Sequence, residues 1–281
     1  MKVFLNGDFG DDTITRRLIG PGWLQFDGIR NGYCGTRNGQ LGPQQPADPV
    51  FGAQQVTGPT TDGLDVLTIC WNAAQVESLP LPSNGRILAV EAGNEPEIGT
   101  DSPKMTAAAY VRDVAVPVVV ACNARNIPVF IGAISNPEPK KFKWLAEVVR
   151  LMPPGLIFGV SRHRYWKVDE TVGYKNRAEE HAAWQAVVNG RPWAETETGV
   201  NLVPECKGWW FWRRCRTPTE ADQATYIRAE IRLAKQEGCA LLVVYQINSG
   251  GQDQHGIRDA VGTWRQSATV VAEMKTAGDL P

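Results

Sequence analysis

Short apolar runs that alternate with helix-like segments are the feature that most restricts how these 281 residues can fold. Most of the runs are apolar at consecutive positions rather than at every second one. This pattern is typical of parallel strands that are covered by helices on both faces of the sheet. The sequence predicts strands over residues 3–5, 29–34, 66–71, 87–92, 128–134, 156–160, 193–196 and 240–247.

Helices are predicted between most of these strands, and local signals mark several of their ends. Thr217-Pro218-Thr219-Glu220 reads as a capping box with proline at the first helical position. Asn189-Gly190 is typical of a helix C-terminus, and Pro117 should kink the helix that contains it. The predicted helices cover residues 106–126, 140–151, 176–188, 217–238 and 263–277, with a broken helix over 14–26 and a long irregular connection over 36–62.

The number of strand–helix units decides between two α/β architectures. About eight units in a chain of this length favour one closed (β/α)8 TIM barrel that spans residues 1–281 as a single domain. A doubly wound sheet would also have buried parallel strands. However, Gly7 and Gly10 are followed by Asp11-Asp12, which does not fit a glycine-rich dinucleotide loop at the start of a helix.

Composition excludes several classes of protein. Lys and Arg total 29 and Asp and Glu total 30, so the net charge of −1 argues against a nucleic-acid partner and against a basic membrane-surface patch. No membrane span is expected, because the most apolar stretch, 114–122, is far shorter than about 20 residues. The N-terminus has no apolar signal-peptide region. We therefore expect a soluble protein, cytoplasmic as the sequence stands or extracellular if a leader has been removed.

The cysteines and histidines do not suggest a metal site. None of the six cysteines forms a Cys-x-x-Cys pair, and His181 and His255 have no partners at ligand spacing. Cys206 and Cys215 bracket a short segment, so they form either a disulfide or two free thiols. We expect no metal and no cofactor.

Polar and aromatic residues follow several of the predicted strands, at the end where barrel enzymes carry their active sites. Two carboxylates at the ends of separate strands suit glycoside cleavage, in which one acid protonates the leaving oxygen and the other, about 5 Å away, attacks the anomeric carbon. Arg30, His163 and Tyr165 could donate hydrogen bonds to the attacking carboxylate. The candidate site residues are Arg30, Trp71, Asn94, Glu95, His163, Tyr165, Trp166, Glu197, Tyr245 and Gln246.

Three of these motifs resemble a known group of enzymes. Asn94-Glu95-Pro96 resembles the Asn-Glu-Pro signature of clan A glycoside hydrolases, the retaining (β/α)8 enzymes. Thr196-Glu197-Thr198-Gly199 resembles the strand-seven motif of that clan, and His163-Arg164-Tyr165 resembles its His-x-Tyr on strand six. Within that clan, these motifs most resemble those of glycoside hydrolase families 39 and 5. The resemblance implies a retaining hydrolase of β-linked poly- or oligosaccharides, with Glu95 as acid/base and Glu197 as nucleophile.

The resemblance also implies roles for the neighbouring residues. Asn94 would bind the sugar 2-hydroxyl, Tyr165 would donate to Glu197, His163 would line the same subsite, and Arg30 would steady the nucleophile. Tyr245, followed by Gln246, stands where the clan usually has tryptophan, which leaves the sugar open. Trp71 and Trp166, at the mouths of their strands, are candidate sugar contacts.

Several alternatives stay open among the carboxylates. Glu195 and Glu197 share strand parity, so both could point the same way; Glu197 is preferred because it lies further out. Glu91 reads as a buried strand residue with a basic partner, and Glu97 as a solvated or substrate-contacting one.

Other readings of the chain also remain. The segment Trp209-Trp210-Phe211-Trp212, with Arg213 and Arg214, could be a sugar platform, a loop packed on its own barrel, or a docking loop. The short connection 72–86 suggests an open cleft and internal cleavage. The main alternative function is a catalytically silent glycan-binding barrel. A lyase or aldolase would need a lysine at a strand end or a metal cluster, and the sequence shows neither. A structural barrel, the remaining alternative, would use the tryptophan-rich loop to dock a partner protein. The oligomeric state is not predicted.

Overall fold

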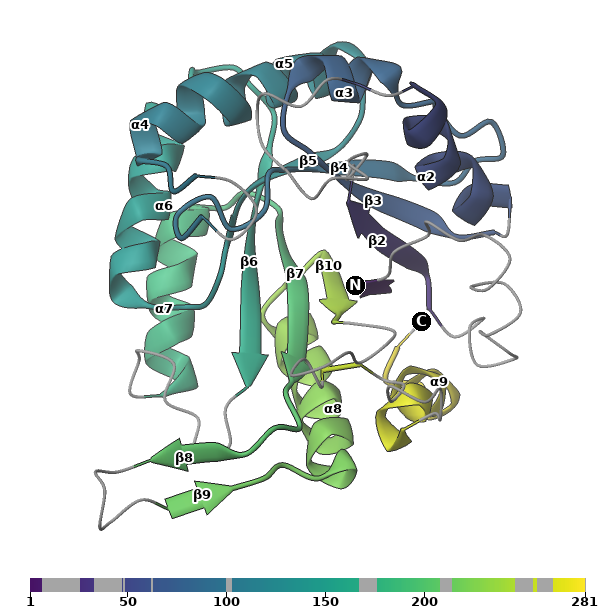
Figure 1. Ribbon diagram of the computed structural model, residues 1–281, viewed down its shortest axis with the longest axis vertical. Coiled ribbons are helices and arrows are strands. Elements are labelled where there is room, and N and C mark those ends of the chain that lie inside the picture. The colour runs from purple at the N-terminus through teal and green to yellow at the C-terminus, as the bar shows by residue number, and fades with distance from the viewer. Residues whose placement is uncertain are drawn as a thin grey trace.

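The computed structural model describes residues 1–6, 26–32, 47, 49–61, 63–99, 103–166, 176–207, 214–245, 255–256 and 265–280. Its centre is a closed barrel of eight strands, which pair in the order β1-β10-β7-β6-β5-β4-β3-β2. Every neighbouring pair is parallel. Helices surround the strands (Figure 1), so the predicted (β/α)8 barrel is confirmed.

All eight predicted strands are present. Strands β6 and β7 extend further than predicted, and this extension carries them through the His163 and Glu197 motifs. The barrel strands are β1 (Lys2–Asn6), β2 (Gly28–Gly32), β3 (Asp65–Cys70), β4 (Leu88–Ala92), β5 (Val129–Ile134), β6 (Gly159–Trp166), β7 (Trp193–Val200) and β10 (Leu241–Val244).

The predicted helices are present with small shifts at their ends. The helical segments are α2 (Pro49–Thr61), α3 (Ala73–Ser78), α4 (Ala107–Tyr110), η2 (Val111–Ala115), α5 (Val116–Ala124), α6 (Pro139–Leu151), α7 (Arg177–Val188), α8 (Glu220–Gln236), η4 (Gln266–Thr269) and α9 (Val270–Thr276). Helix α8 is capped by Thr219, not Thr217, and Asp222 completes the capping box. Asn189 ends α7 in the left-handed conformation, as the sequence predicts.

The prediction of an irregular connection over 36–62 is wrong for its second half, which forms α2. Gly58 and Pro59 are poor helix residues and hide this helix in the sequence. Tertiary packing outweighs their low propensity, because Val56 is fully buried in the core. Of the predicted broken helix over 14–26, residues 14–25 lie outside the described residues.

The helix that contains Pro117 has an irregular stretch just before the proline. The chain is π-helical over Val111–Ala115 and continues as α5, whose second residue is Pro117. Proline lacks the N–H that an α-helix needs at this position, and a π-turn is one way to accommodate the loss. The segment Ala107–Ala124 is long and apolar enough to cross a membrane by composition, but half of that window is buried inside the fold.

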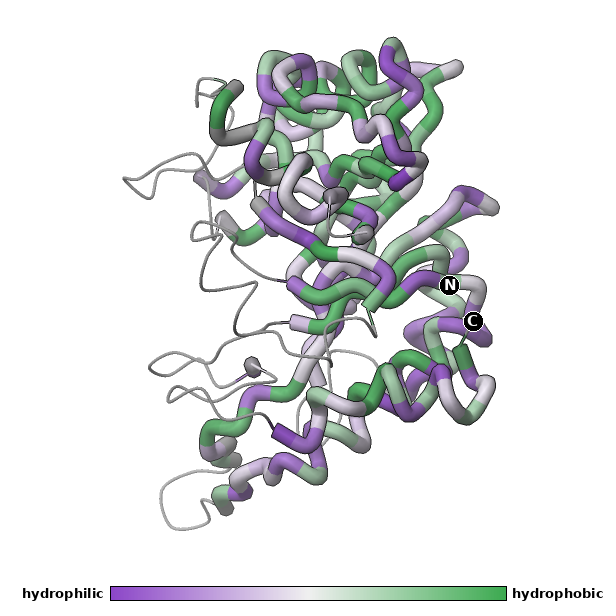
Figure 2. The backbone as a smooth tube through the Cα atoms, turned by 90° about the vertical axis from the view of Figure 1, so that its right-hand side faces the viewer, coloured by the Kyte–Doolittle hydropathy of each residue, from purple (hydrophilic) through white to green (hydrophobic). Residues whose placement is uncertain are grey.

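Two apolar layers support the barrel. The interior is filled at one level by Phe4, Leu67, Ala89, Phe130, Ala194, Leu241 and Val243. A larger core fills the space between the strands and the helices. Apolar segments recur along both strands and helices (Figure 2), as expected for a sheet covered by helices. Polar side chains occupy the barrel above the inner apolar layer.

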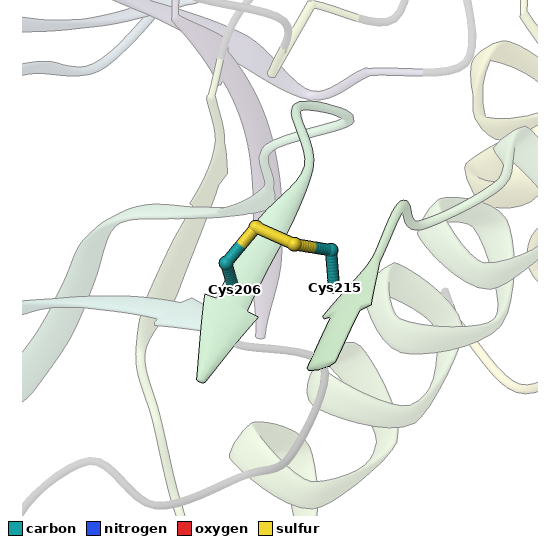
Figure 3. Close-up of a disulfide and its surroundings, with 2 residues drawn as sticks. All are labelled: Cys206 and Cys215. Carbon is teal, nitrogen blue, oxygen red and sulfur yellow. A yellow bond between two sulfur atoms is a disulfide. The ribbon is translucent and has the colours of Figure 1, made fainter. Parts of the chain in front are cut away.

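A small hairpin extends beyond the carboxyl ends of β6 and β7 (Figure 1). Its strands are β8 (Glu205–Lys207) and β9 (Arg214–Arg216), which pair antiparallel. Cys206 and Cys215 face each other across the hairpin and form a disulfide (Figure 3). This settles the choice between a disulfide and free thiols. The Trp209–Trp212 segment lies outside the described residues.

Candidate active site

Glu95 and Glu197 meet at the carboxyl end of the barrel, although 102 positions of sequence separate them. Glu95 follows β4, and Glu197 lies on β7. Between them lies His163 of β6, whose Nδ1 is 3.1 Å from Glu95 Oε1 and 3.3 Å from Glu197 Oε2. The nearest ligand atoms of these three side chains all lie within 4.8 Å of one another. The structure therefore brings together the two carboxylates that the sequence singled out.

Hydrogen-bond donors gather around Glu197. Arg30 Nη1 donates to Glu197 Oε1 at 2.7 Å, and the Tyr165 hydroxyl donates to Glu197 Oε2. A carboxylate that accepts charged and neutral donors is stabilised in its ionised form. The two donors thus fix the Glu197 carboxylate at a position close to Glu95.

Arg30 links this carboxylate to two further side chains. Its Nη2 donates to Asn94 Oδ1 at 2.8 Å, and its Nε and Nη2 donate to Glu91 Oε2 at 2.8 and 2.6 Å. Burial opposes the charge of Arg30, but Glu91 and Glu197 outweigh burial and raise its pKa further above the ordinary value. Glu91 has the basic partner that the sequence suggested. The bond to Asn94 Oδ1 also holds the Asn94 side chain next to the group that binds Glu197.

His163 is fully buried and lies between two carboxylates. Burial lowers the pKa of His163, and Arg30 lowers it too, but Glu197 and Glu95 raise it more, so the net shift is upward. The imidazolium form therefore persists to a higher pH than in a free histidine. A proton on His163 can bridge the two carboxylates when no substrate separates them.

The backbone at Glu95 adopts an unusual conformation. Glu95 has φ of 44° and Ala133 of β5 has φ of 39°, both in the left-handed region. The Glu95 N–H donates to the Ala133 carbonyl at 3.2 Å. Each such non-glycine residue costs about 1–3 kcal/mol, and such strain concentrates at functional sites. The strain is thus stored in the segment that aims Glu95.

The expectation that Glu195 and Glu197 share one face of β7 is wrong. Arg162 pairs with Glu195, and the next residue, His163, pairs with Glu197, so Thr196 is an extra residue on β7. The pairing with β10 shifts over the same stretch. A bulge of one residue reverses the alternation of side chains. As a result, Glu197 faces the barrel interior and Glu195 faces the helices.

Glu195 belongs to a buried ion cluster between the barrel wall and helices α7 and α8. Its Oε2 is 3.2 Å from Arg162, and further ion pairs link the members to one another. The cluster consists of Arg162, Arg164, Arg177, Glu180, Glu195, Glu230 and Glu237. Burial, and then the charge of Glu230, raise the pKa of Glu195 to about 8, against the pull of the arginines. Burial also disfavours the anion of Glu230, but Arg164, Arg177 and Arg162 outweigh it and lower its pKa.

Glu97 is buried rather than solvated, contrary to the prediction. Its Oε1 accepts the Ser135 N–H at 2.7 Å, and the Lys141 ammonium contacts the Ser135 hydroxyl. Burial raises the pKa of Glu97, and the bonds to Ser135 oppose this shift. Glu97 therefore anchors the loop after Glu95 to the segment after β5.

Two predicted sugar contacts, Trp71 and Trp166, have no suitable exposed face. Trp71 is completely buried in the core, and its ring lies directly behind Gly93. Trp166 lies on the outer side of β6 and stacks on Tyr226 of α8 with ring centroids 5.0 Å apart. Side chains alternate along a strand, so the parity that turns His163 and Tyr165 inward turns Trp166 outward. Both tryptophans pack the fold beside the site.

At the last barrel strand, Tyr245 lies beside the predicted site. Its ring packs edge-on against Tyr165, with centroids 5.6 Å apart, and His255 packs against both tyrosines. Gln246 lies outside the described residues. The ring of Tyr245 thus supports the tyrosine that contacts Glu197.

Sequence reasoning missed Ser161, which shares the inward parity of His163 on β6. Its hydroxyl donates to Glu91 Oε1 at 2.9 Å and accepts the Ala133 N–H at 3.1 Å. The two-residue spacing between Ser161 and His163 could have placed Ser161 inside the barrel, because residues two apart on a strand lie on the same face.

Glu95, His163 and Glu197 are also the one group, within the described parts of the chain, whose donor atoms are close enough to share a metal ion. Two carboxylates and an imidazole suit a divalent ion such as Zn²⁺. The guanidinium of Arg30, 2.7 Å from Glu197, opposes a cation at this position. The surroundings therefore favour acid–base chemistry over metal binding.

Neither protein-family models nor curated proteins give a match to this sequence. Solved structures do match over nearly the whole chain. An endo-β-1,3-glucanase of family GH128 from Sorangium cellulosum has a TM-score of 0.62 at 14% identity, covering 96% of this chain and 97% of its own. A β-xylosidase from Caulobacter crescentus has a TM-score of 0.65 at 14% identity, with coverage of 98% and 68%. A broad-specificity endoglucanase, "GH5-4", from Clostridum cellulovorans has a TM-score of 0.61 at 11% identity, with coverage of 98% and 93%. At these identities the likeness establishes the barrel fold.

Proposed function

We propose that this protein is a retaining glycoside hydrolase that uses Glu197 as nucleophile and Glu95 as acid/base. The observation that carries the proposal is the spacing of the carboxylates, whose nearest oxygens lie within 4.8 Å. Retaining enzymes hold their carboxyl groups about 5–5.5 Å apart, whereas inverting enzymes need about 6.5–9.5 Å to admit a water molecule. The spacing therefore favours direct attack by a carboxylate over attack by water.

The donors around the two carboxylates support this division of roles. Arg30 and Tyr165 both donate to Glu197, which suits the group that must be ionised before it attacks. Glu95 lies at the mouth of the barrel on the loop after β4, where its proton can reach a leaving oxygen.

The reaction then has two displacements. A Glu197 oxygen attacks the anomeric carbon as the glycosidic C–O bond breaks, and Glu95 gives its proton to the departing oxygen. The product is a covalent glycosyl ester on Glu197. In the second step Glu95 takes a proton from water, the water oxygen attacks the same carbon, and the ester bond to Glu197 breaks.

We propose β-linked glucan or xylan chains as the substrate class. The structural neighbours named as a β-1,3-glucanase, an endoglucanase and a β-xylosidase support this choice. The short connection between β3 and β4 supports cleavage inside the chain. Asn94, whose side-chain oxygen is bound to Arg30, would bind the sugar 2-hydroxyl.

A panel of β-linked polysaccharides and aryl β-glycosides tests the activity. Reducing ends released by the wild type should fall by at least about 10³-fold in Glu197→Gln and in Glu95→Gln with a poor leaving group. Glu195→Gln is the matched control, because Glu195 faces away from the barrel interior, and it should retain activity. Release that is equal in Glu197→Gln and the wild type would overturn the assignment. Binding of these glycans without any hydrolysis would support the silent barrel instead.

A further inference from the structure

Glu91 occupies a junction beneath the two candidate catalytic carboxylates. It lies on β4, is completely buried, and shares the inward parity of Ala89, which is part of the inner apolar layer. Both of its oxygens accept hydrogen bonds, and each has a different partner. Oε2 accepts two hydrogen bonds from Arg30, and Oε1 accepts one from Ser161. A buried carboxylate with this many donors orders the groups that bind it.

One arm of the junction leads to Glu197. The guanidinium of Arg30 is planar, so two bonds from Nε and Nη2 to Glu91 fix the plane of the whole group. The remaining edge, Nη1, then points at Glu197 Oε1 at 2.7 Å. Glu91 therefore sets the direction from which Arg30 binds the nucleophile. Glu91 and Glu197 both form ion pairs with this one guanidinium.

The other arm leads to Glu95. The Ser161 hydroxyl donates to Glu91 at 2.9 Å, with the Ile131 carbonyl as a longer alternative acceptor at 3.4 Å, and it accepts the Ala133 N–H. The Ala133 carbonyl in turn accepts the Glu95 N–H. Ala133 and Glu95 both have positive φ, and residues in such a conformation persist only where their surroundings hold them. Ser161, oriented by Glu91, supplies one of those restraints.

We propose that Glu91 is a positioning residue that aims both catalytic carboxylates, Glu197 through Arg30 and Glu95 through Ser161 and Ala133. This inference rests on the proposed function. Among the described residues, the charged and titratable groups with an interaction to Glu91 are Arg30 from β2 and Tyr110 from α4. Burial raises the pKa of Tyr110, so its hydroxyl stays neutral and binds the Ala92 carbonyl.

Steady-state kinetics separate the two arms. Glu91→Gln should lower kcat about 10²-fold with KM within about 3-fold, because misplacing reacting groups by a fraction of an ångström has effects of this size. The charge of Arg30 would then act on Glu197 alone and stabilise the Glu197 carboxylate more strongly. The acid limb of the kcat/KM profile should therefore move to lower pH, a shift that loss of packing would not produce.

Ser161→Ala interrupts only the arm that leads to Glu95. It should lower kcat about 10-fold for an aryl glycoside with a poor leaving group and leave the acid limb in place. A good leaving group needs little proton donation in the first displacement, which kcat/KM reports, so that substrate should restore kcat/KM of Ser161→Ala to near the wild-type value but not that of Glu91→Gln. Equal effects of the two variants on both substrates would contradict the two-arm arrangement.

An NMR titration of His163 tests the role of Glu91 without an activity assay. His163 faces Glu95, Glu197, Arg30 and Tyr165, so its pKa reports the balance of charge at this point. In Glu91→Gln the charge of Arg30 is less compensated, and the pKa of His163 should fall. Glu195→Gln is the matched control, because this buried carboxyl faces Arg162 on the helix side of the barrel wall rather than Arg30, and it should leave the titration unchanged.

Glu91→Asp serves as a second variant if Glu91→Gln does not fold. It keeps the charge and shortens the reach, so it should lower kcat while the His163 titration stays in place. A wild type that hydrolyses nothing would overturn the proposed function, while the His163 titration would still decide the junction. An unchanged His163 pKa in Glu91→Gln, or an unchanged kcat in an active enzyme, would overturn the inference.

Discussion

Glu195 and Glu197 are two positions apart on β7, yet their side chains lie on opposite sides of the barrel wall. The extra residue Thr196 forms the bulge that separates them. Glu197 meets Arg30, Tyr165 and His163 inside the barrel, and Glu195 meets Arg162 outside it. The bulge thus gives adjacent carboxylates different environments, one built for an anion and one that retains its proton.

The first prediction concerns Glu195 and stability. Its folded-state pKa is raised from 4.5 to about 8, so the folded protein keeps a proton that the unfolded chain loses. Stability therefore falls as pH rises from about 4.5 to 8, and this loss is absent in Glu195→Gln. Thermal melts at several pH values should show Glu195→Gln close to the wild type at pH 4.5 and more stable at pH 8.

Glu230→Gln is the matched control in the same cluster. The pKa of Glu230 is lowered by its arginines, so its anion stabilises the fold above about pH 4.5. Removing one partner from a buried ion pair costs about 3–5 kcal/mol, and Glu230→Gln should melt well below the wild type at pH 7. A Glu195→Gln variant that is destabilised in the same way would contradict the assignment of the proton to Glu195.

The second prediction concerns Tyr165. Tyr165→Phe removes a neutral donor from the Glu197 carboxylate, so the ionised form of Glu197 loses one of the hydrogen bonds that stabilise it. Since the nucleophile must be ionised, the acid limb of the kcat/KM profile should move to higher pH, opposite to Glu91→Gln. We expect kcat to fall about 10-fold, the loss of roughly one hydrogen bond. A pH profile that keeps its acid limb would show that Tyr165 does not act on the nucleophile.

The third prediction concerns the reach of Arg30. Lysine keeps the positive charge but cannot bond Glu91, Asn94 and Glu197 together, so Arg30→Lys should lower kcat about 10²-fold. Arg125→Lys is the control, because Arg125 binds only the backbone carbonyls of Val76 and Leu79, at the start of the β3–β4 connection, among its described contacts. Its initial rates should match those of the wild type. Comparable losses in both variants would point to a general effect of arginine replacement.

The fourth prediction concerns the strained residue Ala133. Glycine tolerates its φ of 39°, so Ala133→Gly should relieve strain of about 1 kcal/mol, offset in part by the greater freedom of glycine in the unfolded chain. The melting temperature should stay level or rise by a few degrees while kcat falls, because the carbonyl that holds Glu95 becomes freer. A rise in both quantities would mean that the strain serves no catalytic purpose.

The sequence alone predicted the barrel because its signals repeat along the chain. Eight apolar strands and the motifs at Glu95, His163 and Glu197 each carry local information, and the barrel brings them together. The bulge at Thr196 could not be predicted, because nothing in Glu195-Thr196-Glu197 marks an extra residue. Helix α2 was not predicted, because Gly58 and Pro59 disfavour a helix in the sequence. The contacts of Val56 with the core stabilise it in the fold.

The aromatic residues show the limit of the same reasoning. Trp71 and Trp166 stand at strand ends, as sugar contacts often do, but one is enclosed by the core and the other is turned outward by strand parity. Once His163 is placed inside the barrel, the alternation of side chains along the strand predicts that Trp166 points outward. For Trp71 no local signal distinguishes a core tryptophan from a platform.

The stereochemistry of the first product tests the central claim most directly. A β-linked oligosaccharide is hydrolysed in an NMR tube, and the anomeric protons of the new reducing end are followed before mutarotation. Two displacements at one carbon through Glu197 predict that the β-anomer appears first and then equilibrates. Initial release of the α-anomer would mean a single attack by water and would contradict the assignment of Glu197 as nucleophile.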